Sequence, residues 1–299
     1  METRIAATFI KVAELGNITR AAEQLGYSQG AVTSQIKQLE EDLGVLLFDR
    51  VGRGIRLTDA GKRFREYAIR LVQASEDADA FAMDESDPEG HLIIETTSSV
   101  SIGIMSRCLA GFHLRYPKVS ISVRLSEDTD VLVDHVRQNK VDFSILMGPL
   151  GIYENCEIAV QHKEEFRFVT SPADKLAKRC DVTLDEILDD SFISVFISTD
   201  RDMKNEYVVE TYLRERGYDI CPGIEFGTIA SVINYIKYNG GHAFLPLFMI
   251  ESELKRGDLC IIDTEHIDIN EYVQVIYSST RWISPQMKAF TDYMREVLQ

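Results

Sequence analysis

NITRAAEQLGYSQGAVTSQIKQLEEDL, residues 17–43, is the stretch that decides the fold. Its pattern predicts two short helices joined by a tight turn. Ala22 is small enough to let the two helices approach closely, and Gly26 tolerates the positive φ that such a turn requires. Val32 then begins the apolar face of the second helix. This is the layout of a helix-turn-helix, whose second helix enters a DNA major groove.

The second helix combines an apolar stripe with a polar face. Ser28 can cap it, and Val32, Ile36, Leu39 and Leu43 recur at steps of four, three and four residues. On the opposite face, glutamine can bond adenine, hydroxyls can bond several base edges, and lysine can reach a phosphate or guanine. The alternative is a face that is merely solvated. The residues expected to contact DNA here are Ser28, Gln29, Thr33, Ser34 and Lys37.

A basic hairpin is expected next. Residues 49–58, DRVGRGIRLT, place two short extended pieces around a glycine-rich turn. A hairpin beside a recognition helix acts as a wing, whose arginines can grip phosphates or enter the minor groove. Arg50 and Arg53 are therefore assigned to DNA contact.

A long helix should begin near Asp59, with Thr58 as its cap. Apolar residues recur four and three positions apart, an a/d pattern that indicates a helix needing a partner. Self-pairing through residues 60–81 would place two recognition helices on one face of DNA. Packing against its own domain is the alternative. The apolar positions are Ala60, Phe64, Tyr67, Leu71, Ala74, Ala78 and Phe81.

The pattern changes after a polar linker that is rich in acidic residues. Strands alternate with helices, which predicts an α/β domain with parallel sheets. A segment of about 200 residues suits two lobes, with ligand at the carboxyl ends of the strands. The elements are expected at residues 91–96, 100–114, 119–125, 130–138, 143–147, 165–170, 184–188, 191–197, 205–216, 224–226, 231–238, 243–245, 272–277 and 285–298.

Charge is divided unevenly along the 299 residues, whose net charge is −16. Residues 1–70 carry 11 Lys and Arg against 9 Asp and Glu, whereas the rest carries 21 against 39. An acidic body would be repelled by phosphate and would turn the N-terminal part toward DNA. The alternative is that the acidic residues only keep a large domain soluble.

Other patterns limit the functional class. The five cysteines are dispersed and form no CxxC pair, which favours free thiols in a reducing cytoplasm. The sequence has no long apolar run and no signal-peptide pattern, so we expect a cytoplasmic protein without a membrane segment. Walker A, GxGxxG, HExxH and GxSxG motifs are absent, and the histidines lack metal-ligand spacing. We therefore expect no enzyme, no cofactor and no metal.

Several short motifs resemble those of the LysR-type transcriptional regulator family, and the resemblance extends over the whole chain. The motifs are AAEQL (21–25), SQ (28–29), QI (35–36), LEE (39–41), LG (43–44), LFDR (47–50) and LTDAG (57–61). Within this pattern Gly30 stands where proline is common and Ser34 where arginine is frequent. The resemblance implies dimers or tetramers that bend promoter DNA, contact RNA polymerase and respond to a small ligand.

The implied fold is α/β with an α-rich N-terminal winged helix-turn-helix over residues 1–58. A dimerising linker helix (59–84) and a hinge (85–90) connect it to an effector domain (91–299) that resembles type II periplasmic binding proteins. Lobe I of this domain covers about residues 91–162 and 266–299, and lobe II about 163–265.

The resemblance also places an effector between the lobes. Hydroxyls and free backbone N–H groups at a helix start suit a carboxylate or another anion. Glu95 replaces a frequent glycine near this pocket. If buried, it would oppose an anion or need a basic partner or a proton, so the effector could be cationic, zwitterionic or absent. The implied effector residues are Thr97, Ser98, Ser99, Thr129, Gly148, Ser198 and Thr228.

Rival functions remain open at this point. A regulator without a small ligand could be constitutive or switched by cysteine oxidation, although Cys180 and Cys221 lack a recognisable redox motif. A solute-binding protein would lack residues 1–85 and would need a secretion signal, and an enzyme has no catalytic motif to support it.

Overall fold

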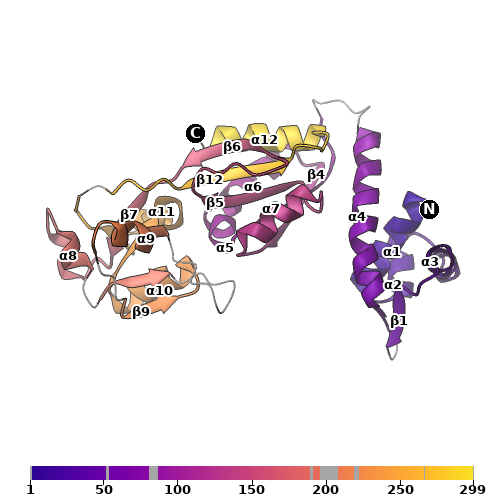
Figure 1. Ribbon diagram of the computed structural model, residues 1–299, viewed down its shortest axis with the longest axis horizontal. Coiled ribbons are helices and arrows are strands. Elements are labelled where there is room, and N and C mark those ends of the chain that lie inside the picture. The colour runs from indigo at the N-terminus through magenta and orange to yellow at the C-terminus, as the bar shows by residue number, and fades with distance from the viewer. Residues whose placement is uncertain are drawn as a thin grey trace. The chain divides into compact units, whose positions relative to one another are not determined.

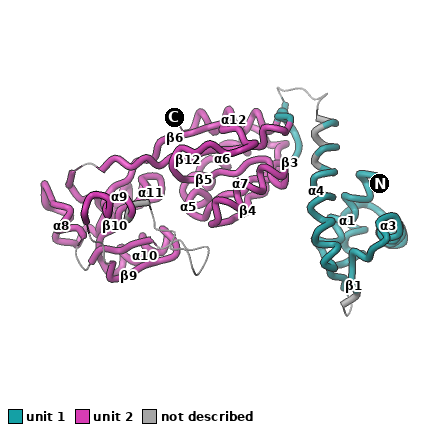
Figure 2. The backbone as a smooth tube through the Cα atoms, in the orientation of Figure 1, with its two compact units in different colours: residues 1–90, 282–285 teal, residues 91–281, 286–299 magenta. Residues whose placement is uncertain are grey.

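The structure is a computed structural model of the chain, and it forms two compact units (Figures 1 and 2). Unit 1 comprises residues 1–90 with 282–285, and unit 2 comprises residues 91–281 with 286–299. The structure describes residues 2–51, 54–80, 87–188, 191–195, 208–218, 222–265 and 267–298. No helix within these ranges is long and apolar enough to cross a bilayer.

Unit 1 begins with the three helices α1 (Thr3–Leu15), α2 (Ile18–Leu25) and α3 (Gln29–Leu43). Both α2 and α3 begin with a side-chain cap, and the prediction for Ser28 is confirmed. Asn17 Oδ1 accepts a hydrogen bond from Arg20 N at 3.0 Å, and Ser28 Oγ accepts one from Ala31 N at 3.2 Å. Gly26 ends α2 with φ of 70°, the left-handed conformation that glycine adopts at little cost. The helix-turn-helix therefore forms from local signals.

The apolar stripe of α3 is shorter than its sequence predicts. Val32, Ile36 and Leu39 are buried in a core with Phe9 of α1, but Leu43 is 40% exposed. Gly44 ends the helix at this point with φ of 69°, and the chain turns away from the core. The expectation for Leu43 was therefore wrong.

The wing is an antiparallel hairpin of β1 (Phe48–Val51) and β2 (Gly54–Leu57), in which Arg50 pairs with Ile55. It is followed by α4 (Asp59–Ala80). Thr58 Oγ1 accepts a hydrogen bond from Gly61 N at 2.9 Å, which confirms Thr58 as the cap.

The apolar positions of α4 divide between two faces, so the single predicted seam is wrong. Phe64 and Leu71 pack into the core of unit 1, where the ring of Phe64 meets that of Phe9 at 5.0 Å. Tyr67 is 61% exposed on another face, and Ala74 and Ala78 are exposed as well. The apolar surface of α4 is broad. One side packs against α1, and a second, narrower stripe stays exposed.

Lobe I of unit 2 is built on a five-stranded sheet between helices (Figure 1). Leu92 and Ile94 face the core that includes Phe112 and Phe290, whereas Ile93 faces the core formed with α7. The strand order is β4 (Val119–Leu125), β3 (Gly90–Thr96), β5 (Phe143–Gly148), β12 (Tyr272–Ser278) and β6 (Cys156–Lys163). The helices are α5 (Ser98–Val100), the π-helix η1 (Ser101–Met105), α6 (Ser106–Arg115), α7 (Thr129–Arg137) and α12 (Pro285–Val297).

Lobe II contains a three-stranded and a two-stranded sheet. The first has the order β10 (His242–Pro246), β7 (Phe166–Thr170) and β11 (Cys260–Ile261); the second pairs β8 (Ile193–Val195) with β9 (Ile224–Phe226). The helices are η2 (Lys175–Lys178), α8 (Leu184–Ile187), α9 (Val208–Glu215), α10 (Ile229–Asn239) and α11 (Leu247–Arg256).

The sheets are mixed, so the prediction of parallel sheets was wrong for the pairings of β12 and of β7. β3 and β5 are parallel, but β12 runs antiparallel to both β5 and β6, and β7 runs antiparallel to its neighbours. The cause is the double crossing between lobes, because the chain that returns from lobe II enters lobe I in the opposite direction. Glu164 N donates to Glu271 O at 2.8 Å where the two crossing segments meet.

Candidate nucleic-acid interface and ligand-binding region

The polar face of α3 is open to solvent, with all of its predicted DNA-facing residues exposed: Ser28, Gln29, Thr33, Ser34 and Lys37. Thr33 Oγ1 donates to Gln29 O at 2.9 Å, which fixes the hydroxyl on the helix surface. Lys37 Nζ lies 3.3 Å from Glu41 Oε1. Such an exposed pair contributes little stability, so the ammonium can exchange its partner for a phosphate at small cost.

Glu40 holds α3 against the wing, a role that the sequence pattern did not reveal. Its Oε1 accepts hydrogen bonds from Leu47 N at 2.7 Å and Phe48 N at 3.1 Å. These two N–H groups belong to the turn and to the first residue of β1. The only sequence signal was an acid that ends an otherwise uncharged or basic helix face. Glu40 thus fixes the wing relative to the recognition helix.

The wing is also fixed from two other sides. Ile55 N donates to Gly16 O at 3.1 Å, and Thr58 Oγ1 donates to Leu46 O at 2.8 Å. A Cβ on Gly61 would lie 2.1 Å from Leu47 O, so only glycine fits this approach of α4 to the backbone. Arg56 is exposed on β2. Arg53 and the side chain of Arg50 lie outside the described residues.

Lobe I brings most of the predicted effector residues to one edge of its sheet. The parallel strands β3 and β5 both end at this edge. Thr97 directly follows β3, and α7 begins at the same edge. Gln274, a buried residue not predicted from sequence, donates through Nε2 to Gly148 O at 3.4 Å and Pro149 O at 3.2 Å. Members of this edge are Thr97, Ser98, Ser99, Thr129 and Gly148. Thr228 lies in lobe II, and Ser198 lies outside the described residues.

The hydroxyls at these positions also serve as helix caps. Thr97 Oγ1 accepts from Val100 N at 3.5 Å and lies 3.2 Å from Ser99 Oγ. Thr228 Oγ1 accepts from Ser231 N at 3.2 Å at the start of α10. Thr129 follows the cap of α7, because Asp128 supplies the capping carboxylate. Thr97 and Ser99 are half-buried and Thr129 and Thr228 are exposed, so these side chains can serve the local structure and still contact a ligand.

A carboxylate of the chain itself already occupies the expected anion position. Glu127 Oε1 accepts a hydrogen bond from Ser98 N at 2.9 Å. Carboxylates are stabilised by free N–H groups at a helix start. An anionic effector at Ser98 N would therefore have to displace Glu127.

Glu95 points away from the predicted pocket and has a basic partner. It is 5% exposed, and its Oε2 lies 2.7 Å from His135 Nδ1 on α7. Glu95 shares its side of β3 with Ile93, which packs into the core formed with α7. Because His135 satisfies this carboxylate, Glu95 places no constraint on the charge of an effector.

The two lobes contact each other through α11. Arg107 Nη1 on α6 lies 2.6 Å from Glu251 Oε2, and a Cβ on Gly103 would lie 2.3 Å from the ring of Phe248. Beside these contacts is a groove of about 260 Å³ with walls from both lobes. None of the predicted effector residues that the structure describes lines this groove.

The described thiols are free and three of them are poorly suited to oxidation. Burial raises the pKa of the thiols of Cys108, Cys156 and Cys260, and a raised pKa lowers the fraction of reactive thiolate. Cys180 is exposed, and Cys221 lies outside the described residues. Among the described residues, no group of three His, Cys, Asp or Glu side chains could hold a metal ion.

Comparison with protein families matches both parts of the chain. Residues 4–62 match the bacterial regulatory helix-turn-helix protein, lysR family, and residues 85–299 match the LysR substrate binding domain. The chain is 27% identical to the HTH-type transcriptional regulator YofA of Bacillus subtilis (strain 168), with 99% of each chain covered. It is 29% identical to YofA of Bacillus velezensis, over 95% of this chain and 94% of that protein.

Solved structures share the fold. CbnR in complex with its target DNA superposes with a TM-score of 0.67 at 18% identity, covering 99% of both chains. Full-length OxyR from Pseudomonas aeruginosa gives a TM-score of 0.68 at 16% identity, covering 99% of this chain and 95% of that one. The matched families and relatives are regulators and not enzymes, as the sequence predicted. This chain therefore belongs to the LysR family of DNA-binding transcriptional regulators.

Proposed function

We propose that α3 reads operator DNA from the major groove while the wing contacts adjacent phosphates. The observation that carries this proposal is the exposed polar face of α3, held in place by the Ser28 cap and by Glu40. Gln29 lies at the first turn of α3, where recognition helices reach base edges. Lys37 lies two turns further on and suits a phosphate.

The protein acts as a dimer through the uncovered stripe of α4. Tyr67, Ala74 and Ala78 follow each other at steps of seven and four, and the guanidinium of Arg70 lies 4.7 Å from the centre of the Tyr67 ring. Small alanines permit close helix approach, and a second copy would bury this stripe. Pairing, higher assembly and contact with RNA polymerase are what we expect of a member of this family.

Mobility-shift titration with the upstream region of its own gene tests the DNA assignment. Gln29→Ala should weaken binding by about tenfold, since a good base contact contributes about 1–3 kcal/mol. Lys37→Ala should weaken binding to all sequences and reduce the slope of log K against log salt by about one. Lys11→Ala is the matched control, because it removes a similar surface ion pair from α1. If both α3 variants bind like the Lys11 variant, α3 is not the reading element.

A small polar effector binds at the edge of lobe I formed by Thr97–Ser99, Thr129 and Gly148, with Thr228 of lobe II as a further contact. The support is the group of hydroxyls, of which those of Thr97, Ser98 and Ser99 are half-buried and those of Thr129 and Thr228 are exposed. The Glu127 carboxylate at Ser98 N supports it as well. An anionic group would take the place of Glu127, whereas a cationic group would pair with it. The rival reading, a switch without ligand, would depend on Cys180 or Cys221, because the other three thiols have raised pKa values.

A thermal-shift screen of amino acids, amines and carboxylates, repeated with Glu127→Gln, separates these cases. A carboxylate should bind more tightly to the variant because its competitor is weaker, and an amine should bind less tightly. Thr97→Val and Ser99→Ala should reduce either response. A ligand whose shift is the same in all four proteins binds elsewhere, and this result would refute the site while leaving the DNA assignment intact.

A further inference from the structure

Each of the two segments that cross between the lobes carries a buried carboxyl group (Figure 1). Glu164 follows β6 and Glu271 precedes β12, and their side chains are 6% and 4% exposed. The two residues are neighbours, because Glu164 N donates to Glu271 O at 2.8 Å. Neither carboxylate forms an ion pair with any residue that the structure describes. A buried carboxyl group without a basic partner is most stable in its neutral form.

Glu164 also holds the first turn of α11. Its Oε1 accepts a hydrogen bond from Phe248 N at 3.1 Å, and Glu165 O accepts one from Leu247 N at 2.7 Å. Pro246, at the N-cap of α11, has no side-chain acceptor to offer. The first N–H groups of a helix need partners from outside the helix. For α11 the crossing segment supplies two of them, so the position of this helix depends on that segment.

The same helix brings lobe II against lobe I. Phe248 and Met249 pack on Gly103 of η1, where an added Cβ would meet the ring of Phe248 and lie 3.0 Å from Met249 Sδ. One turn further along, Glu251 Oε2 lies 2.6 Å from Arg107 Nη1 of α6. Phe248 therefore takes part in both contacts, through its N–H with the crossing segment and through its ring with lobe I.

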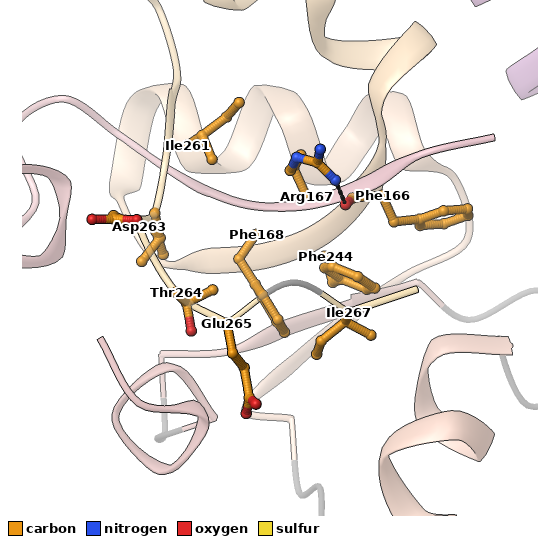
Figure 3. A pocket seen from close by; sticks show the side chains of 10 residues that line it. Phe166, Arg167, Phe168, Phe244, Ile261, Asp263, Thr264, Glu265 and Ile267 are labelled. Atoms are coloured by element: carbon orange, nitrogen blue, oxygen red, sulfur yellow. Dashed lines mark hydrogen bonds between the residues drawn. The ribbon is translucent and has the colours of Figure 1, made fainter. Parts of the chain in front are cut away.

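The basic side chains near this crossing are already engaged by other groups. Arg107 is bound to Glu251, and Arg167 Nη2 of β7 lies 2.9 Å from Glu165 Oε2. Arg167 also donates through Nη1 to Phe166 O at 2.9 Å, the bond that is drawn in Figure 3. These guanidinium groups therefore leave the buried carboxyl of the crossing segment without an ionic partner.

Two further groups near the crossing segments can carry a proton. Tyr153 lies close to Glu271, and burial raises the pKa of its phenol, which keeps the phenol neutral. His162 is half-buried and lies two residues before Glu164, on the same side of β6 because the side chains of a strand alternate. A histidine changes its charge near neutral pH, so the effect of Glu164 has to be separated from that of His162.

We propose that Glu164 and Glu271 form a proton-operated latch between the two lobes. In their neutral form the crossing segments stay packed, α11 keeps its place against η1, and the lobes keep the arrangement of this structure. Loss of the two protons places negative charge in an apolar interior, and a movement of the lobes that admits water relieves this cost. A rise in pH therefore favours an open arrangement. The latch is independent of the proposed effector site, because the proton is its only ligand.

The pKa values of the two groups give the direction of the response. Burial raises both to about 7, and at Glu164 this outweighs the hydrogen bond from Phe248 N, which favours the ionised form. Glu251 and Glu165 add to the rise and Arg107 opposes it. In water the pKa of a glutamate is about 4.3, so between the two values the packed arrangement binds more protons than an open one. The ratio of packed to open molecules therefore falls as pH rises, by up to about tenfold per pH unit for each group.

Methyl NMR of the full-length chain, labelled with [13C-methyl]methionine, can follow the latch. Met249 reports on the contact between the lobes because its Sδ lies beside Gly103, and Met294, buried in lobe I, is the internal control. Met249→Leu assigns the signal. Between about pH 5.5 and about pH 8.5 the Met249 signal should shift or divide, whereas that of Met294 should stay in place. A Met249 signal that does not change with pH overturns the proposal.

Two variants assign the transition to its titrating groups. Glu164→Gln with Glu271→Gln cannot release the protons, so the Met249 signal should keep its low-pH position over the whole range. His162→Gln is the matched control, a neutral substitution on β6 that should leave the transition unchanged. A transition that is lost only in the double variant supports the latch. A transition that survives in the double variant, or is lost in both proteins, overturns it.

A third variant provides the test if the double variant does not fold. Glu165→Gln removes an exposed negative charge beside Glu164 and releases Arg167. Both changes favour the ionised carboxylate, so the transition should move to lower pH by roughly a few tenths of a unit. A midpoint that stays in place or moves to higher pH overturns the proposal.

Discussion

The recognition helix and the effector region handle their polar groups in opposite ways. On α3 the side chains proposed to function point into solvent, and the groups that hold the helix, the Ser28 hydroxyl and the Glu40 carboxylate, are separate from them. In the effector region the same hydroxyls that would meet a ligand also cap helices, and Glu127 already bonds Ser98 N. Changing the first surface should alter binding alone, whereas changing the second alters structure as well.

The strongest test of this contrast is Gly61→Ala, which should damage the frame of unit 1 without touching its DNA-facing side chains. The new Cβ would lie 2.1 Å from Leu47 O, a backbone atom that cannot move aside. We expect a loss of about 3 kcal/mol in the free energy of unfolding of unit 1 and a loss of DNA binding. Urea unfolding and mobility shift measure both. A stable variant that binds normally would show that the wing tolerates displacement.

A pH titration should expose the buried carboxyls of unit 2. Burial raises the pKa values of Glu164 and Glu271 to about 7, and both lie where the chain crosses between lobes. Between about pH 4.5 and 7 these two groups bind more protons in the folded protein than in the unfolded chain. The free energy of unfolding therefore decreases as pH rises through this range. Each pK unit corresponds to about 1.4 kcal/mol, so the total is a few kcal/mol.

The double variant Glu164→Gln, Glu271→Gln should remove this dependence. Each glutamine is neutral at every pH, and its amide oxygen at position 164 can still accept from Phe248 N, which lies 3.1 Å from Glu164 Oε1. Urea unfolding at pH 5 and pH 8 should show a smaller pH difference than in the unchanged protein. An unchanged difference would place the titrating groups elsewhere.

Glu40→Ala should have an intermediate effect. It leaves Leu47 N and Phe48 N without their carboxylate acceptor, at a cost of about 1–2 kcal/mol. Glu41→Ala, one residue further on and exposed, is the control. Because the wing loses its tie to α3, DNA affinity should fall more than stability alone explains. Equal stability and affinity in the two variants would contradict the role of Glu40.

The smallest effect on stability should come from Lys37→Ala. The variant removes one exposed pair with Glu41, and the free energy of unfolding should change by no more than about 0.5 kcal/mol. Thermal unfolding of this variant should match that of Lys11→Ala. A larger loss would mean that α3 uses this side chain for folding, which would break the contrast between the two surfaces.

The fold of unit 1 was predictable because its signals are local. Ser28 and Thr58 are caps that can be recognised within four residues, and each one caps as expected. The sequence did not predict which surface an apolar residue packs against when two surfaces are possible. Phe64 and Leu71 fit a seam equally well between helices of one domain or of two copies, and only the fold shows that they face α1.

Unit 2 was predictable in outline only. The strand β6 and the helix α11 were missed, since β6 lies at a sheet edge with mixed burial and α11 has no polar N-cap of its own. Pairings such as Glu95 with His135 and Glu127 with Ser98 join residues 40 and 29 positions apart. No periodicity encodes such contacts, so the sequence could say what a buried Glu95 would need but not that His135 supplies it.

The bond between Glu127 and Ser98 N would make the capture of an anion at the proposed effector site an exchange reaction. The carboxylate is attached to the same molecule, so its effective concentration at the N–H group is set by the geometry of the protein and not by dilution. The apparent affinity of an anion is reduced by the fraction of molecules in which Glu127 has moved away. If an anion binds at the proposed effector site, the Glu127 carboxylate would thereby set the concentration of anion that is required, independently of how well the rest of the ligand fits.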